Sequence, residues 1–184
     1  MGTKKQSVFR RLTTALLCSM LAAALVFTVT PISAQAAAKK VTASTNYKKA
    51  PKLKVGTNKV TAKKNSAYVK FTAAKAGTYT FTMSDVATIP AKKPDHNLGH
   101  FTIRKDTGYY LSAQKVSTNG GKETYLEMAT KDSYNDYYKG QKVKKNSYLA
   151  SRYGKLKLKK GETVYIQYFH TGGKCSYTMK VKKG

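Results

Sequence analysis

The chain has 184 residues, of which 35 are Lys or Arg and only 8 are Asp or Glu, so its formal net charge is +27. Hydrophobic residues make up 41% of the chain and Tyr alone fills 14 positions. This content is sufficient for a hydrophobic core and excludes a wholly disordered chain. The length is that of a single domain.

The first 38 residues have the pattern of a secretory signal peptide. Basic residues at positions 4, 5, 10 and 11 precede an almost continuous apolar segment at 15–29, and Pro31 precedes the small residues Ala34 and Ala36. This order is typical of a cleavable signal, and we predict cleavage just after Ala36 or Ala38. A retained membrane anchor is the alternative, but the apolar segment is short for a membrane span. We therefore expect a secreted or cell-wall-associated protein with no transmembrane segment after cleavage.

Removal of this segment leaves 31 basic and 8 acidic residues, a net charge of +23, and a single cysteine, Cys175. One cysteine cannot form a disulfide within the chain, so the core must stabilise the fold. Residues 176–179 have strand composition, which favours a small strand residue at Cys175 over a bridge between chains or a reactive thiol. We expect a monomer.

Residues 39–64 are rich in lysine, and no acidic residue precedes Asp85. The beginning of this segment is typical of a flexible arm. Leu53, Val55 and Val60 indicate one or two short strands toward its end. We therefore divide the chain into a signal peptide at 1–38, a basic arm at 39–64 and a folded domain at 65–184.

From residue 67 onward, apolar and polar residues alternate in short segments. In the segment 78–83, Tyr79, Phe81 and Met83 fall on one side and threonines on the other. Such alternation of aromatic and β-branched residues predicts strands, whereas no segment has a sustained helical period. Residues 85–100, with Pro90 and Pro94, and residues 132–145 are predicted loops. Strands are predicted at 68–72, 78–83, 101–104, 109–113, 125–128, 155–159, 163–169 and 176–181.

About eight to ten short strands at nearly regular spacing predict an all-β sandwich or barrel, and we favour an antiparallel β-sandwich. Two Lys-flanked glycine turns, at 75–77 and 160–162, each precede an alternating strand. The segments 68–81, 156–166 and 177–181 resemble the bacterial pre-peptidase C-terminal domain family. The resemblance implies a jelly-roll-like, non-catalytic sandwich found on secreted proteins, some of which bind collagen or polysaccharide and take calcium at acidic loops. The basic arm lacks those acids, so no calcium site is carried over.

Catalytic candidates are few. His96 and His100 are four residues apart, as on one helical face, but the prolines before them and Gly99 between them favour a loop or strand edge. Neither these residues nor His170 has the sequence context of a nucleophile–base pair. Glu123 and Glu127 are expected to pair with nearby lysines. We therefore predict no enzyme activity, no catalytic residue, no metal site and no cofactor.

A tyrosine-rich segment is the candidate ligand loop. Its rings could stack on sugar and its polar groups could form hydrogen bonds, or the rings could pack on the core with their hydroxyls in water. Asp132 and Asp136 provide too few oxygen ligands for a recognised calcium loop. The candidate residues are Tyr134, Asn135, Asp136, Tyr137 and Tyr138.

The lysines are the dominant feature. Lys155, Lys157 and Lys159 alternate with two leucines, which predicts three ammonium groups on one solvent-facing side of a strand. Lys180, Lys182, Lys52 and Lys54 complete the candidate polyanion-binding set. A merely solubilising surface is the alternative, but at this charge we favour binding to anionic surface polymers or polysaccharide.

The predominance of lysine over arginine suits diffuse charge attraction and not sequence-specific recognition of nucleic acid. The sequence thus predicts a non-catalytic binding module for anionic polymers. A carbohydrate- or matrix-protein-binding module that uses the tyrosine-rich loop is the alternative.

Overall fold

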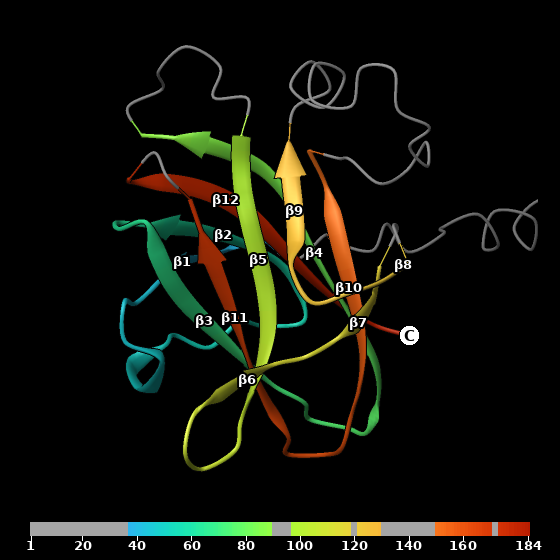
Figure 1. The fold of residues 1–184 in the computed structure, drawn as a ribbon. Coiled ribbons are helices and arrows are strands. Elements are labelled where there is room, and N and C mark those ends of the chain that lie inside the picture. Colours follow the sequence, from blue (N-terminus) through green and yellow to red (C-terminus); the bar gives the residue numbers. More distant parts are fainter. Residues whose placement is uncertain (1–36, 90–96, 119–120, 130–149, 171–172) are drawn as a thin grey trace, which may run out of the picture. The chain divides into compact units, whose positions relative to one another are not determined.

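The computed structural model describes residues 37–89, 97–118, 121–129, 150–170 and 173–184. These residues form two packed β-sheets (Figure 1). The seven-stranded sheet has the order β1 (Lys39–Thr42), β2 (Gly56–Ala62), β12 (Cys175–Lys183), β4 (Gly77–Thr88), β10 (Arg152–Leu158), β7 (Val116–Thr118) and β8 (Gly121–Glu123). The five-stranded sheet has the order β3 (Ser66–Thr72), β11 (Thr163–Phe169), β5 (Asn97–Asp106) and β6 (Leu111–Ala113), and β9 (Leu126–Ala129) also pairs with β5.

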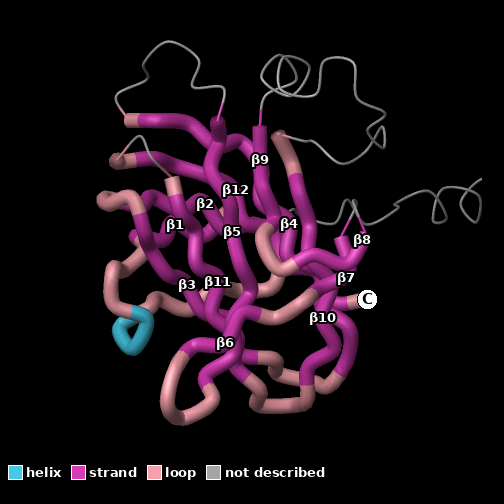
Figure 2. Tube along the Cα trace, viewed as in Figure 1, coloured by secondary structure: helices cyan, strands magenta, loops and turns pink. Residues whose placement is uncertain are grey.

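The predicted all-β, sandwich-like fold is confirmed. The described residues contain twelve strands, more than the eight to ten expected. A wholly antiparallel arrangement is wrong at one edge, where β1 pairs with β2 in parallel. Within the described ranges, the only helix is the 3-10 turn η1 (Tyr47–Lys49), drawn in cyan in Figure 2, and no helix is long and apolar enough to cross a membrane.

The beginning of the lysine-rich segment is part of the sheet and not a flexible arm. Residues 39–42 form β1, and Val41 is paired with Val60 of β2. Both valines and Leu53 are buried in the core shared with the rest of the domain. Burial of these few apolar side chains fixes the segment despite its charge. Val55, in contrast, is exposed and lies outside the strands.

Two predicted boundaries are also corrected. β4 continues to Thr88 and β5 begins at Asn97, so both ends of the predicted loop at 85–100 are strand, while residues 90–96 lie outside the described residues. The strand predicted at 109–113 begins only at Leu111, because a tight turn precedes it. In this turn the Gly108 N–H donates to the Asp106 carboxylate, and Gly108 has a φ of 87°, which glycine adopts readily.

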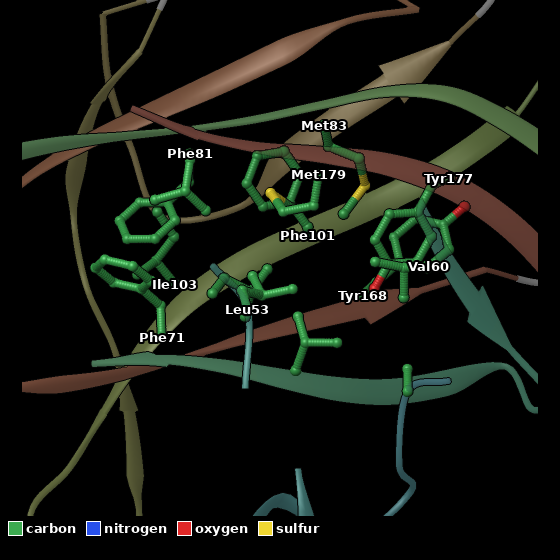
Figure 3. Packing of buried hydrophobic residues seen from close by; sticks show 14 of the residues in the cluster. Leu53, Val60, Phe71, Phe81, Met83, Phe101, Ile103, Tyr168, Tyr177 and Met179 are labelled. Carbon is green, nitrogen blue, oxygen red and sulfur yellow. The ribbon is translucent and has the colours of Figure 1, made fainter. Parts of the chain in front are cut away.

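The core lies between the sheets and follows the predicted alternation. Tyr79, Phe81 and Met83 of β4 are buried, as expected. Figure 3 shows Phe81 beside Phe71 and Met83 near Met179. The rings of Phe71 and Phe81 have centroids 5.5 Å apart in an edge-to-face arrangement, which favours aromatic packing. The two sheets therefore share one hydrophobic core.

Cys175 has no exposed surface and is a free thiol. Burial raises the pKa of this thiol to about 11, so it is protonated near neutral pH. The prediction of a small strand residue is confirmed. An exposed, reactive or interchain cysteine is not compatible with this position.

A buried arginine connects the sheets. Arg152 of β10 is 2% exposed, and its guanidinium pairs with Glu123 of β8. The same guanidinium donates to the backbone carbonyl of Glu127 on β9, at 2.8 Å. The expected pairing of Glu123 with a lysine is therefore wrong. This buried arginine is stabilised because its Nη1 and Nη2 groups both donate to oxygens.

Candidate anion-binding face

Four of the predicted lysines lie on one side of the seven-stranded sheet. Lys155 and Lys157 of β10 are exposed, and the leucines that alternate with them are buried or packed against the core. Lys180 and Lys182 of β12 are exposed and alternate with buried residues in the same way. Because alternate residues of a strand point to opposite sides of a sheet, these four ammonium groups share its outer side.

A strand of hydroxyl side chains separates the two lysine-bearing strands. β4 lies between β10 and β12, and Thr80 is paired with Lys155 on one side and with Lys182 on the other. Neighbouring strands are about 4.8 Å apart, so the lysines on β10 and β12 are spaced by about 10 Å at the backbone. This is about one Debye length at 0.1 M salt. The position of β4 thus prevents direct opposition of the lysines of β10 and β12, which would destabilise the sheet.

A groove on the same side holds a second lysine pair that the sequence reasoning did not single out. Lys40 of β1 is the direct neighbour of Lys59 of β2. The groove has a volume of about 430 Å³. Its other polar lining residues are Asp85, Thr42, Thr61, Ser176 and Thr178. Alternation of Val41 and Val60 with polar residues was the signal that could have placed both lysines on this side.

Among the described residues, Asp85 is the only carboxylate of this groove and of the strand faces around it. Its Oδ2 lies 3.7 Å from Lys59 Nζ and accepts a hydrogen bond from the Ser84 hydroxyl. The pKa of Asp85 lies below its ordinary value because the hydroxyls of Thr178 and Ser84 hydrogen-bond to the carboxylate and Lys59 lies nearby. Lys59 Nζ also donates to Thr178 Oγ1 at 2.7 Å. The ion pair is solvent-exposed and therefore weak.

Asp85 also has an unusual backbone. Its φ of 52° is the only positive value among the described residues other than glycine. The residue lies beside an irregularity in the pairing of β4 with β12, between Ser176 and Thr178. Such backbone geometry costs about 1 kcal/mol or more. Asp85, the one carboxylate among the described residues on this side, thus lies at a local distortion of β4.

We call this side of the seven-stranded sheet the lysine–threonine face. Its side chains are lysines and hydroxyl-bearing residues, with one carboxylate, Asp85, and one tyrosine, whose ring lies 5.3 Å from Lys155 Nζ. The members of the face are Lys40, Thr42, Thr57, Lys59, Thr61, Thr78, Thr80, Thr82, Ser84, Asp85, Tyr153, Lys155, Lys157, Ser176, Thr178, Lys180 and Lys182.

The other three predicted lysines are not on this face. Lys159 follows β10 in a turn, where its N–H donates to the Glu162 carboxylate at 2.7 Å. Lys52 forms a bridge with Lys70 of β3, in the other sheet. Lys54 donates from Nζ to the carbonyl of residue 37 at 2.6 Å. The structure therefore brings together the predicted lysines of β10 and β12, whereas Lys52 and Lys54 lie outside the strands of this face.

The remaining candidates are outside the lysine–threonine face or outside the described residues. The predicted ligand loop, Tyr134 to Tyr138, and the predicted cleavage residues Ala34 and Ala36 belong to the second group. So does His96. His100 is on β5 of the other sheet, and His170 is fully buried with its ring 6.0 Å from that of Tyr168. Nowhere in the described ranges do three or more His, Cys, Asp or Glu residues gather as a metal site would require.

In comparisons with known proteins, no family model and no curated protein matches the chain. The resemblance to the pre-peptidase C-terminal domain family therefore stays a prediction.

Proposed function

We propose that this protein is a secreted or cell-wall-associated, non-catalytic module that binds anionic polymers through the lysine–threonine face. The observation that carries the proposal is the composition of this face. Across the five neighbouring strands β1, β2, β12, β4 and β10, the described residues of this face include six lysines and one carboxylate. Such a surface attracts polyanions over a distance comparable to the Debye length.

The expected mode of binding is diffuse. Lysine ammonium groups are mobile point charges, unlike the planar guanidinium that recognises one phosphate with two hydrogen bonds. The hydroxyls of β4 lie between the lysines and can donate to phosphate, sulfate or carboxylate oxygens. Affinity then comes from many weak contacts and from release of counterions, and it carries no recognition of base sequence. Suitable ligands are phosphate- or carboxylate-bearing polymers of the cell surface.

The test measures retention on immobilised polyphosphate and dextran sulfate over a range of sodium chloride concentrations. In the face variant, Lys155, Lys157, Lys180 and Lys182 are changed to Gln. In the control variant, Lys48, Lys49, Lys75 and Lys160, which are exposed elsewhere, are changed to Gln. Both variants lose the same charge.

For the wild-type protein we expect affinity to fall steeply with salt. The face variant should reduce the slope of log affinity against log salt by about 3, while the control should change it far less. Retention that does not depend on salt would contradict the electrostatic mechanism. Equal losses in the two variants would contradict the assignment to this face, because net charge alone would then explain binding.

A further inference from the structure

The outer side of the five-stranded sheet carries aromatic residues that the proposed binding of polyanions does not involve. Along β11, Val164, Ile166 and Tyr168 are buried, whereas Tyr165, Gln167 and Phe169 alternate with them and point outward. Phe169 remains 38% exposed and Tyr125, just before β9, 56% exposed. Exposed aromatic rings on a sheet face are unfavourable in water and often mark a binding surface.

These rings are in contact across the strands. The rings of Phe169 and His100 are nearly parallel, with centroids 5.4 Å apart, because the two residues are direct neighbours on β11 and β5. Tyr125 lies edge-on to His100, with centroids 5.6 Å apart. A continuous row of three rings thus crosses β11, β5 and the start of β9.

A second group of rings lies on the same side of the sheet. Tyr165 of β11 contacts Tyr47 of η1 edge-on, with centroids 5.4 Å apart. Tyr47 also contacts Tyr68 of β3, at 6.3 Å. Tyr165 and Phe169 are four residues apart on one strand, which separates the two groups by about 13 Å. We call these six residues the aromatic face: Tyr47, Tyr68, Tyr165, His100, Phe169 and Tyr125.

Polar side chains held in place by hydrogen bonds lie between the two groups. Gln167 is on β11 between Tyr165 and Phe169, and its amide donates to the Ser66 hydroxyl at 2.9 Å. Arg104 of β5 donates from Nε to Thr102 Oγ1 and from Nη1 to the Leu111 carbonyl. These contacts orient an amide and a guanidinium next to the rings, where both can form further hydrogen bonds.

The strands on this side carry a smaller excess of positive charge than the lysine–threonine face. Their outward residues and the Lys52 bridge include two acidic groups, Asp106 and Glu127, and three cationic groups, Lys52, Lys70 and Arg104. Lys48 and Lys49 of η1 are also exposed beside Tyr47. A long polyanion has little reason to prefer this side. Interleaved charges also interrupt the apolar area that a protein partner would bury. The complementary ligand has flat C–H faces, many hydroxyls and no charge.

We propose that the aromatic face binds a neutral polysaccharide chain that runs along β11. The C–H groups of successive sugar rings would lie against the two groups of aromatic rings, whose faces are electron-rich. Gln167 and Arg104 would bond the sugar hydroxyls between them. The separation of the two groups requires a chain of several sugars and not a single sugar.

The test uses the full mature protein in about 0.5 M sodium chloride, which screens the lysines. Binding is measured to insoluble cellulose and chitin by depletion, and to soluble xylan, laminarin and starch by affinity electrophoresis. The double variant Tyr125→Ala with Phe169→Ala removes the two most exposed rings of the aromatic face. The control, Tyr109→Ala with Tyr110→Ala, removes two exposed tyrosines (95% and 64%) from the turn before β6.

We expect at least one polysaccharide to bind, and the double variant to bind it about tenfold more weakly. The control and the four-lysine face variant should bind it as the wild-type protein does. Thermal unfolding of both tyrosine variants shows whether they are folded, and Tyr125→Ala alone, before β9, provides a milder change. Absence of binding to the whole panel, or equal losses in the two double variants, would overturn the proposal. Neither outcome bears on the salt-dependent retention of polyanions.

Discussion

The two sheets are built alike on the inside and differ on the outside. Most strands direct alternate residues into one shared core, for example Phe81 from β4 and Ile166 from β11. Outward, the seven-stranded sheet presents lysines and hydroxyls, and the five-stranded sheet presents aromatic rings among charges of both signs. Alternation alone therefore specifies the core, while the chemistry of the outward residues can differ from sheet to sheet.

Strand order separates charged side chains on one face and brings aromatic rings together on the other. On the lysine–threonine face, β4 lies between the lysines of β10 and β12 and keeps like charges apart. On the aromatic face, β11 and β5 are direct neighbours, which brings the rings of Phe169 and His100 together. The lysines of β10 and β12 are thus spaced and the rings are adjacent, as the physics of each interaction favours, whereas Lys40 and Lys59 are direct neighbours at the edge of the sheet.

The largest expected effect comes from Arg152, the buried arginine that links the two sheets. Arg152→Met would remove the ion-pair partner of Glu123 and the N–H group that donates a hydrogen bond to the Glu127 carbonyl. We expect a loss of about 3 kcal/mol in the free energy of unfolding, measured by urea denaturation. Arg104→Met, on the outer side of β5, should cost about 1 kcal/mol or less. Similar losses in the two variants would show that the contacts of Arg152 do not hold the sheets together.

A smaller change should affect the aromatic face alone. Gly99 has a φ of 77°, and a Cβ at this position would lie 2.1 Å from the carbonyl oxygen of Phe169. Gly99→Ala must therefore shift β5 against β11, and we expect a loss of about 2 kcal/mol and weaker polysaccharide binding. Salt-dependent retention on polyphosphate should remain.

Gly108→Ala is the matched control, since Gly108 also has a positive φ but has no atom within 4 Å of the added Cβ. We expect it to cost about 1 kcal/mol from backbone conformation alone. A cost equal to that of Gly99→Ala would mean that the contact with β11 is unimportant.

The role of β4 as a neutral spacer can be tested with one residue. Thr80→Lys would place a third lysine directly between Lys155 and Lys182. We expect a loss of about 0.5 kcal/mol or slightly more at low salt, and a smaller loss as salt is added. Thr80→Gln has a similar length without charge and should show no such salt dependence. If the two variants respond to salt alike, the spacing of charge is not what Thr80 provides.

The sequence was sufficient to predict what depends on neighbouring residues. Alternation located most strands, the buried side of β4 and the common direction of Lys155 and Lys157. Alternation was insufficient to predict β1. Val41 and Ala43 are the only apolar residues at the beginning of the lysine-rich segment 39–64, and they become core residues only because the segment pairs with β2. Local composition cannot report a partner that is distant in the chain.

The same limit explains the candidate site. Whether Lys180 lies near Lys155 depends on the order β12-β4-β10, which no local pattern encodes. Lys52 and Lys54 were grouped with these residues by composition, and the fold separates them. The buried position of Arg152 was likewise invisible, because a charged residue enters a core only when oxygens from distant strands surround it.

The smallest expected effect is a dependence on pH near 6.5, which should affect the aromatic face and not the lysine–threonine face. The pKa of His100 lies below its ordinary value of 6.5, mainly because of burial, with Arg104 also lowering it and Glu127 opposing the shift. The folded state thus favours the neutral ring, and below about pH 6.5 the unfolded chain binds more protons. Stability should therefore fall slightly as the pH decreases through this value. Asp85 has a pKa below 3.8, so its charge on the lysine–threonine face does not change in this range.

An NMR titration of the imidazole signals measures this pKa, with His100→Gln used to assign the resonance. We expect a midpoint below 6.5 for His100, and a weaker dependence of the unfolding midpoint on pH in the variant. Polysaccharide binding should follow the same titration, because His100 touches both Phe169 and Tyr125, whereas retention on polyphosphate should not follow it. A midpoint at or above 6.5 would mean that the rings around His100 do not shield it from water, and the continuous aromatic row would lose its support.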